Sequence, residues 1–70
     1  MEYLIQCRWD DEAEVWIAVN QVIPIVLEDE SLDRLMRRVR EAAPELLELN
    51  HLPKMGALYF LIEKREEVCA

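Results

Sequence analysis

The sequence predicts a single α+β domain of the order β-β-β-α-β, with one helix packed on one face of an antiparallel sheet. Apolar and polar residues alternate in the segment 2–9, a period of two that is typical of strands, and the segment 57–63 is predicted as a further strand. Between residues 32 and 47 the apolar residues instead recur every three or four positions, as in a helix. The chain has 70 residues, so we expect residues 1–70 to form one domain.

The first two strands are predicted to form a hairpin. Residues 2–9 alternate, and β-branched and aromatic residues resume at 15–19. The polar run 10–14 between them favours local turn contacts over strand pairing. The residues expected on one side of the first strand are Tyr3, Ile5, Cys7 and Trp9.

A third strand is predicted over residues 22–27, after a break at Asn20 and Gln21. Pro24 lacks the amide that a sheet ladder needs. This strand should therefore lie at an edge of the sheet, or Pro24 should occupy a bulge or an unpaired position.

The helix is predicted to begin near Ser31, whose hydroxyl can cap it and which follows the acidic run 28–30. Pro44 removes an amide donor within the apolar stripe, which predicts a kink or a split at this position. Stop signals between Asn50 and Gly56 separate the helix from the fourth strand. The apolar stripe consists of Leu32, Leu35, Met36, Val39, Ala43, Leu46 and Leu47.

Several of the predicted strands carry apolar residues on both faces, although one amphipathic helix can cover only one face of a sheet. An uncovered apolar patch on so small a domain is typical of an interaction surface. We therefore expect a homodimer, or a complex with another protein, to cover it. Strongly twisted strands, with long side chains folding over the rims of the sheet, are the alternative. The expected interface residues are Trp16, Ala18, Val22, Val26, Tyr59 and Leu61, with Trp16 as the anchor.

The chain carries 15 acidic and 8 basic residues, and its net charge of −7 repels a phosphate backbone. We therefore expect no nucleic-acid partner. An acidic surface favours encounter with a basic protein, but it also simply keeps a small domain soluble. Cys7 and Cys69 are too few for a disulfide framework, and no secretory signal or membrane-spanning apolar run is visible. We expect a cytoplasmic protein with reduced thiols.

No cluster in the sequence predicts catalysis, and we expect neither a cofactor nor a metal ion. The acidic run 10–14 offers oxygen ligands, but it lacks the alternation and the turn glycine of a calcium loop, so a solvated turn is favoured. A metal-dependent nuclease remnant is disfavoured because its carboxylates would have to converge in a cleft. His51, the one histidine, is expected at the helix terminus, and Cys7 is expected to pack as a small apolar residue.

Four of the 8 basic residues lie within seven positions of the predicted helix and could contact phosphate groups. However, Asp33 lies four residues before Arg37, and Glu41 lies three after Arg38, which are spacings that favour ion pairs along a helix. A solvated, ion-paired helix face is therefore the favoured interpretation. The four residues are Arg34, Arg37, Arg38 and Arg40.

Several short motifs are spread over residues 2–52. They are Trp9-Asp10-Asp11-Glu12-Ala13, Val15-Trp16-Ile17-Ala18, Ile23-Pro24, Leu32 with Leu35, and Pro44-Glu45-Leu46-Leu47 with Asn50. Together they resemble a small bacterial domain family of unknown function that is grouped with HicB-type antitoxins. The resemblance implies a β-β-β-α-β domain similar to a truncated ribonuclease H fold without ribonuclease activity. In relatives of this kind the domain dimerises and inhibits a small basic mRNA-cleaving toxin.

The sequence departs from this pattern at two turns. Residues 20–26 lack the acidic pair and the glycine of the usual S-D-D-I-P-G-L stretch, and Glu14 stands where a turn glycine is common, which predicts a wider first hairpin. Residues after Ala57 leave no room for the DNA-binding segment of many antitoxins, so we expect no operator binding. Two hypotheses remain: an antitoxin-like protein-binding module, or a solitary homodimeric structural or regulatory domain without a toxin.

Overall fold

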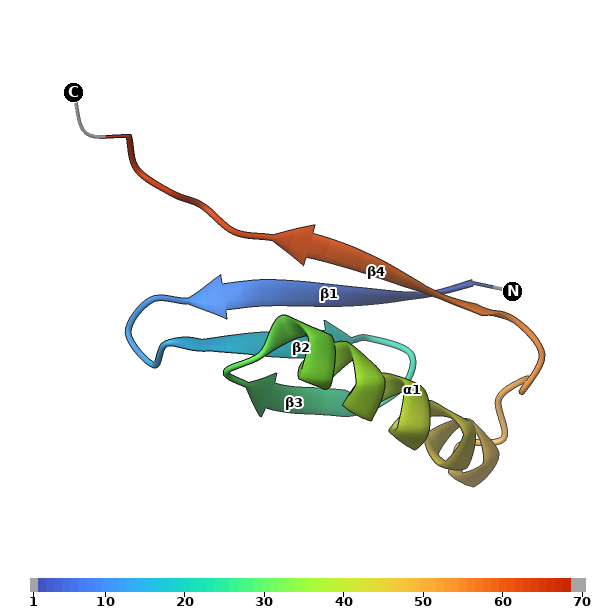
Figure 1. Ribbon diagram of the computed structural model, residues 1–70. Helices are drawn as coiled ribbons and strands as arrows, with labels where there is room; N and C mark the ends of the chain where they lie inside the picture. Colours follow the sequence, from blue (N-terminus) through green and yellow to red (C-terminus); the bar gives the residue numbers. More distant parts are fainter. Residues whose placement is uncertain (1, 69–70) are drawn as a thin grey trace.

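The computed structural model describes residues 2–68, which form one four-stranded sheet and one helix (Figure 1). The predicted α+β class and the β-β-β-α-β order are confirmed. The elements are β1 (Glu2–Asp10), β2 (Val15–Asn20), β3 (Ile25–Asp29), α1 (Leu32–Leu49) and β4 (Ala57–Glu63).

The sheet has the strand order β3-β2-β1-β4 and is mixed rather than wholly antiparallel. β1 and β2 pair antiparallel, as do β2 and β3, but β4 pairs parallel to β1. The expectation of an antiparallel sheet is therefore wrong for the last strand. Two successive reversals make β3 run parallel to β1, and α1 then returns the chain to the end where β3 began. β4 consequently runs in the same direction as β1.

The turn between β1 and β2 spans residues 11–14 and is organised by Asp10. Its carboxylate Oδ1 accepts hydrogen bonds from the amides of Glu12 at 3.0 Å and Ala13 at 3.3 Å. Glu14 closes the turn with φ 54°, in the left-handed region that favours glycine. The acidic run is thus a turn built by local side-chain to backbone bonds.

β3 starts later than predicted, at Ile25, because residues 22–24 belong to the turn between β2 and β3. The Asn20 side chain organises this turn, because its Oδ1 accepts hydrogen bonds from the amides of Val22 at 2.7 Å and Ile23 at 2.6 Å. Ile23 is fully buried beneath the turn. Pro24 lies outside the ladder, and β3 is an edge strand, as its proline predicted.

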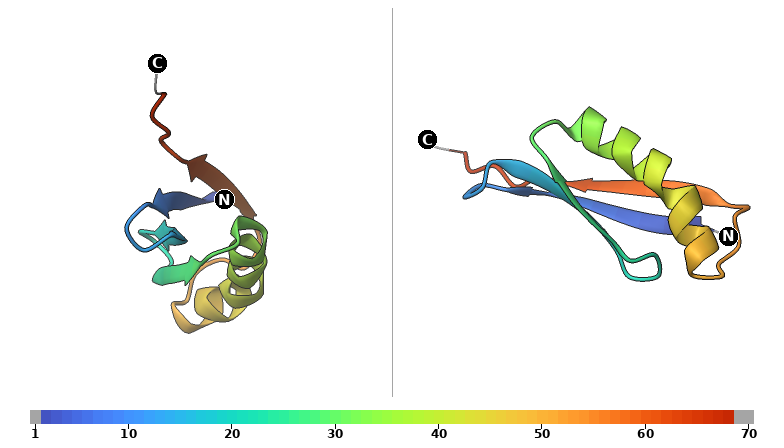
Figure 2. Two further views of the ribbon diagram at one scale, coloured as in Figure 1. Left: turned by 60° about the vertical axis from the view of Figure 1, so that its left-hand side comes forward. Right: turned by 90° about the horizontal axis from the view of Figure 1, so that it is seen from below.

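α1 begins at the predicted cap, where Ser31 Oγ accepts a hydrogen bond from the Arg34 amide at 3.2 Å. Of the two predicted alternatives at Pro44, the split is wrong, because the helix continues without interruption from Leu32 to Leu49. The kink agrees with the bend of the helix axis in its C-terminal half, as Figure 2 shows. The exposed position of Pro44 allows the lost hydrogen bond to be replaced by water.

A tight turn follows the C-terminal end of α1, and it contains His51, as predicted for this histidine. His51 has φ 54°, and its amide donates to the Glu48 carbonyl at 3.2 Å. The Leu52 amide donates to the Leu47 carbonyl at 2.9 Å. These two bonds satisfy carbonyls of the last helical turn and place Leu52 against the core.

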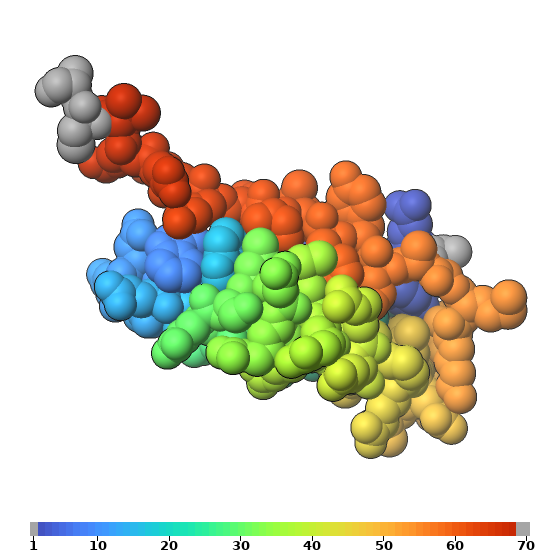
Figure 3. Space-filling view, viewed as in Figure 1, coloured from blue at the N-terminus to red at the C-terminus, as the bar shows by residue number. Residues whose placement is uncertain are grey.

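The core lies between α1 and one face of the sheet. The buried stripe of the helix consists of Leu35, Val39, Ala43 and Leu47, and it packs mainly over β2 and β3. β4 lies beyond the helix, on the far side of β1, and residues 64–68 extend from it away from the domain (Figure 3). Within residues 2–68, no helix is long and apolar enough to cross a membrane. The strand residues of the core are Tyr3, Ile5, Cys7, Ala18 and Ile25.

Candidate functional site

One face of the sheet is covered by α1 and the other is not. Cys7 pairs with Ala18, and Ala18 pairs with Leu27, so these side chains share the covered face. Because side chains alternate along a strand, the intervening residues point to the opposite side, which we call the open face. Its apolar residues are Leu4, Val15, Ile17, Val19, Val26, Tyr59 and Leu61.

The strand register brings the apolar residues of the open face into neighbouring rows. Val26 pairs with Val19 across β3 and β2, and Leu4 pairs with Tyr59 across β1 and β4. Val26 is 72% exposed, Tyr59 54%, Leu4 44% and Leu61 37%. These four side chains therefore remain accessible on a face that no element of residues 2–68 covers.

A row of polar residues crosses the open face close to the C-terminal end of β1. Ile17 pairs with Arg8 on one side and with Glu28 on the other, and Arg8 pairs with Glu63. The open face thus carries apolar residues on both sides of Gln6, which pairs with Val19 and with Leu61, and a row of mixed charge borders them.

The structure places four of the six expected interface residues at accessible positions. Val26, Tyr59 and Leu61 lie on the open face, and Val22 lies in the turn between β2 and β3, where it is exposed. A shallow depression of about 280 Å³ connects this turn to Leu4 at the edge of the open face. The alternation of β3 and β4 therefore placed these residues on an accessible surface, and their role in an interface stays a prediction.

Trp16 and Ala18 lie on the covered face, so their assignment to the interface is wrong. Ala18 is fully buried opposite Cys7. Trp16 is half-buried, packs against the core and meets Trp9 edge-on, with ring centroids 5.5 Å apart. Alternation shows that these two residues share a face, but the register with β1 decides that the helix covers it.

Sequence reasoning missed Leu4 as a member of the open face. Leu4 alternates in phase with the polar residues Glu2, Gln6 and Arg8, which pointed to a solvated side of the first strand. Its pairing with Tyr59 depends on the parallel register of β1 and β4. That register brings residues 55 positions apart together, and no local pattern encodes it.

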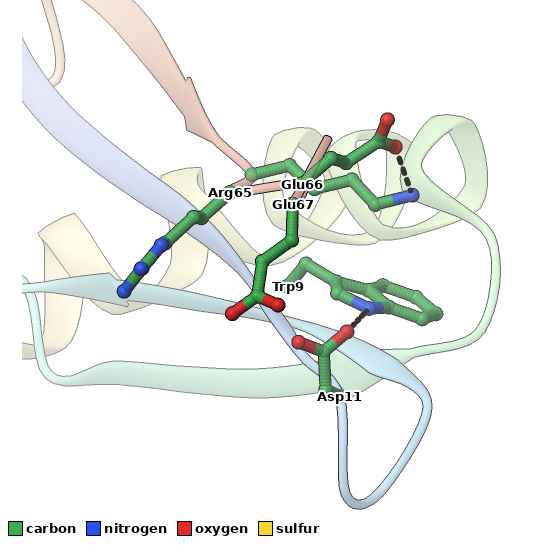
Figure 4. Close-up of a pocket in the computed structure, with 6 residues that line it drawn as sticks. Trp9, Asp11, Arg65, Glu66 and Glu67 are labelled. Atoms are coloured by element: carbon green, nitrogen blue, oxygen red, sulfur yellow. Dashed lines mark hydrogen bonds and ion pairs between the residues drawn. The ribbon is translucent and has the colours of Figure 1, made fainter. Parts of the chain in front are cut away.

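A second surface feature surrounds Trp9 near the end of β1, beside the C-terminal segment (Figure 4). The indole Nε1 donates to Asp11 Oδ1 at 2.6 Å, and the Lys64 ammonium lies 5.0 Å from the centroid of the Trp9 ring system. Lys64 also pairs with Glu66 at 3.1 Å. This pocket has a volume of about 650 Å³, and the Lys64 ammonium already lies over the face of the Trp9 ring that lines it.

The arginines of α1 are partly used inside the domain. Arg34 and Arg38 both pair with Asp29 at the end of β3, at 2.7 and 3.3 Å. Within residues 2–68, neither Arg37 with Asp33 nor Arg38 with Glu41 forms an ion pair, so the expected ion pairs along the helix are wrong, and Arg34 and Arg38 pair instead with a residue of β3. The hydrogen bond from Arg34 and that from the Ser31 amide hold the pKa of Asp29 well below its usual range.

The remaining candidates for chemistry do not assemble a reactive centre. Within residues 2–68, no three metal-ligating side chains are grouped together. Cys7 is buried, and burial raises the pKa of its thiol above the ordinary value, which keeps it protonated near neutral pH. His51 lies in the helix-terminal turn. Cys69 lies outside the described residues.

Comparisons with known proteins agree with this architecture. The model of the family described as Domain of unknown function (DUF1902) matches residues 2–68. A crystal structure of a hypothetical protein from the extremely thermophilic bacterium Thermus thermophilus is similar, with a TM-score of 0.75 and 27% sequence identity over 100% of both chains. No curated protein matches the chain. The likeness to HicB-type antitoxins and to a truncated ribonuclease H fold stays a prediction.

Proposed function

Since the chain belongs to the DUF1902 family of domains of unknown function, we propose its function from its own surface. It is a non-enzymatic protein-binding domain that forms homodimers and binds a basic protein partner, in the manner of the HicB-type antitoxins that its motifs resemble. The open face is the observation that carries this proposal. The family itself adds no activity, so the physical case rests on this surface and on the charge of the chain.

The open face supports protein binding because its exposed side chains are apolar. Removing apolar surface from water lowers the free energy of the complex. Val26, Tyr59, Leu4 and Leu61 are all more than a third exposed. At about 25 cal/mol per Å² of apolar surface, covering a few hundred Å² contributes several kcal/mol before the costs of association. This is comparable to the roughly 5 kcal/mol of net stability that a small domain has. A partner would therefore stabilise the fold as well as bind it.

The net charge of −7 supports a basic partner over a nucleic acid. The helix arginines do not reverse this, because Arg34 and Arg38 are already paired with Asp29. A negative surface accelerates encounter with a positive protein and leaves a steep dependence on salt. The complex is accordingly expected to weaken as ionic strength rises, whereas apolar contacts across the open face are not screened.

The homodimer is tested by light scattering on the eluted protein at micromolar concentration. We expect a mass equal to two chains. A single-chain mass across the concentration range would contradict homodimerisation. The alternative of a solitary homodimeric domain makes the same prediction for mass, so partner binding needs a separate measurement.

Partner binding is tested by affinity capture from a lysate of the native cell with matched charge variants. Val26→Glu adds a negative charge to the open face, and Leu49→Glu adds the same charge at an exposed apolar position near the end of α1. We expect the parent and Leu49→Glu chains to retain the same basic protein and Val26→Glu to lose it. Equal retention by all three chains, or retention of no protein, would contradict the open face as the binding surface.

A further inference from the structure

β4 is an edge strand whose helix-side residues Leu58 and Phe60 are only partly buried against the core. Within residues 2–68 its outer edge pairs with no strand, because β4 ends the order β3-β2-β1-β4. Tyr59 and Leu61 are exposed on the open face, and Ile62, on the face that carries the helix, is 41% exposed as well. The helix lies over β2 and β3 instead (Figure 2). An apolar strand with a free edge is a template for pairing with another strand.

The other edge of the sheet is protected against such pairing. β3 has five residues and follows Pro24 directly. The Ile25 amide donates to the Ile23 carbonyl at 2.7 Å, and the Glu28 carbonyl accepts from Arg38 Nη1 at 2.7 Å. Within residues 2–68, the backbone of β4 forms no comparable bond to a group outside the sheet. The β3 edge is therefore short and partly blocked by its own hydrogen bonds, whereas the β4 edge is free to pair with another strand.

The sequence of β4 is complementary to itself when two copies run antiparallel about Phe60, the middle of its seven residues. Tyr59 then lies opposite Leu61 of the second copy on the open face, and Leu58 lies opposite Ile62 on the helix face. Apolar residues thus face apolar residues in all central rows. Moving the axis to Leu61 would instead place Tyr59 opposite Glu63.

The charges beyond β4 favour the same register. Continuing the pairing past the strand places Glu66 of one copy opposite Lys54 of the other, near a small groove that Arg40 and Lys54 line. Lys54 has only the exposed Glu48 as an ion-pair partner within residues 2–68, at 3.4 Å. Residues 64–68 already extend away from the domain in line with β4 (Figure 1). A second copy would bring its Lys54 towards Glu66, whose ion-pair partner within its own chain is the exposed Lys64.

We propose that two copies of this chain join through their β4 edges, antiparallel about Phe60, to form one continuous eight-stranded sheet. The inference rests on the proposed function in requiring a homodimer, and it names the surface that forms it. Both helices then lie on the same face of the eight-stranded sheet. They do not meet, because each α1 covers β2 and β3, away from the β4 strands at the centre. Both open faces merge on the opposite side, where they remain available to the basic partner.

Cysteine crosslinking tests the register directly, with Cys69→Ser in every chain and the buried Cys7 left in place. Tyr59→Cys and Leu61→Cys are exposed substitutions that leave the core intact. Directly opposed residues lie about 5 Å apart between Cα atoms, within disulfide reach, whereas residues two positions out of register lie beyond about 7 Å. We therefore expect a mixture of the two variants to form disulfide-linked dimers under mild oxidation, and each variant alone to form none.

Val26→Cys, at a more accessible position on the β3 edge, is the control and should form no linked dimer. A charge reversal gives a second test, because the proposed dimer contains two exposed ion pairs between Lys54 and Glu66. Lys54→Glu should raise the dimer dissociation constant about tenfold, and the double variant Lys54→Glu with Glu66→Lys should restore the parent value. A dimer by light scattering that does not crosslink in the mixture, or that crosslinks through Val26→Cys, would overturn the β4 interface and leave homodimerisation standing. A monomer at every concentration would overturn both.

Discussion

Asp29 and Arg34 join the end of β3 to the first turn of α1. Arg34 Nε donates to both carboxylate oxygens of Asp29, at 2.9 and 2.8 Å, and Arg34 Nη2 lies 2.7 Å from Oδ1. The Asp29 side chain is only 6% exposed, while that of Arg34 is 51% exposed. The same carboxylate accepts from the Ser31 amide at 2.9 Å. One carboxylate therefore orients the residue that caps the helix and an arginine of its first turn.

Replacing this carboxylate should destabilise the fold more than removing a surface charge. Asp29→Asn removes the charge that Arg34 and Arg38 share, and a buried group with unsatisfied partners is costly. We expect a clear fall in the urea midpoint of unfolding. Asp33→Asn is the control, because Asp33 is an exposed aspartate in the first turn of α1. Equal effects of the two substitutions would show that the Asp29 network does not stabilise the helix start.

The contribution of Asp29 should depend on pH. Its pKa is lowered in the folded protein, chiefly by the hydrogen bond from Arg34, so the unfolded chain binds a proton at a higher pH than the folded one. The stabilisation is therefore complete above the ordinary aspartate value of about 4 and declines as the pH falls from there towards the lowered pKa. Urea unfolding of the parent and Asp29→Asn chains between neutral and acidic pH should give curves that converge below about pH 4. A constant difference would contradict the lowered pKa.

Glycine at position 51 should stabilise the domain. His51 adopts φ 54° in the turn that ends α1, and a side chain with a Cβ atom costs about 1 kcal/mol in that conformation. His51→Gly should raise the free energy of unfolding by about 1 kcal/mol. His51→Ala keeps the Cβ atom and should leave the stability nearly unchanged. If His51→Gly instead lowered the free energy of unfolding, the imidazole of His51 would have to make a contact that outweighs the backbone strain.

Trp16 should behave as a core residue rather than as an interface anchor. It is half-buried on the covered face and packs against Trp9. Trp16→Ala should lower the free energy of unfolding by about 2–3 kcal/mol, somewhat less than for a fully buried tryptophan, without changing the mass of the folded assembly. Tyr59→Ala should do the reverse, with weaker association and a small effect on the folding of each chain. Loss of the dimer in Trp16→Ala at a concentration where the chain stays folded would contradict this assignment.

The hairpin of β1 and β2, the cap at Ser31 and the strand over residues 57–63 could all be predicted because each is encoded by neighbouring residues. Alternation, a capping hydroxyl and the 3.6-residue stripe act within one or two turns of chain. The beginning of β3 was less predictable, since the run 22–27 is apolar throughout and the Asn20 side chain shifts its first residues into a turn. Apolar composition alone did not distinguish a buried turn residue such as Ile23 from a strand residue.

Local patterns in the chain are enough to predict the strands, the helix and their order, and to show that one helix cannot cover both sides of the sheet. Three features come from long-range packing: β4 pairs parallel to β1, Trp16 and Ala18 lie under the helix, and Leu4 joins Tyr59 on the open face. Alternation defines two sides of each strand but does not say which side meets the core. That choice depends on pairing between residues distant in sequence, and it is made when the helix and all four strands pack together.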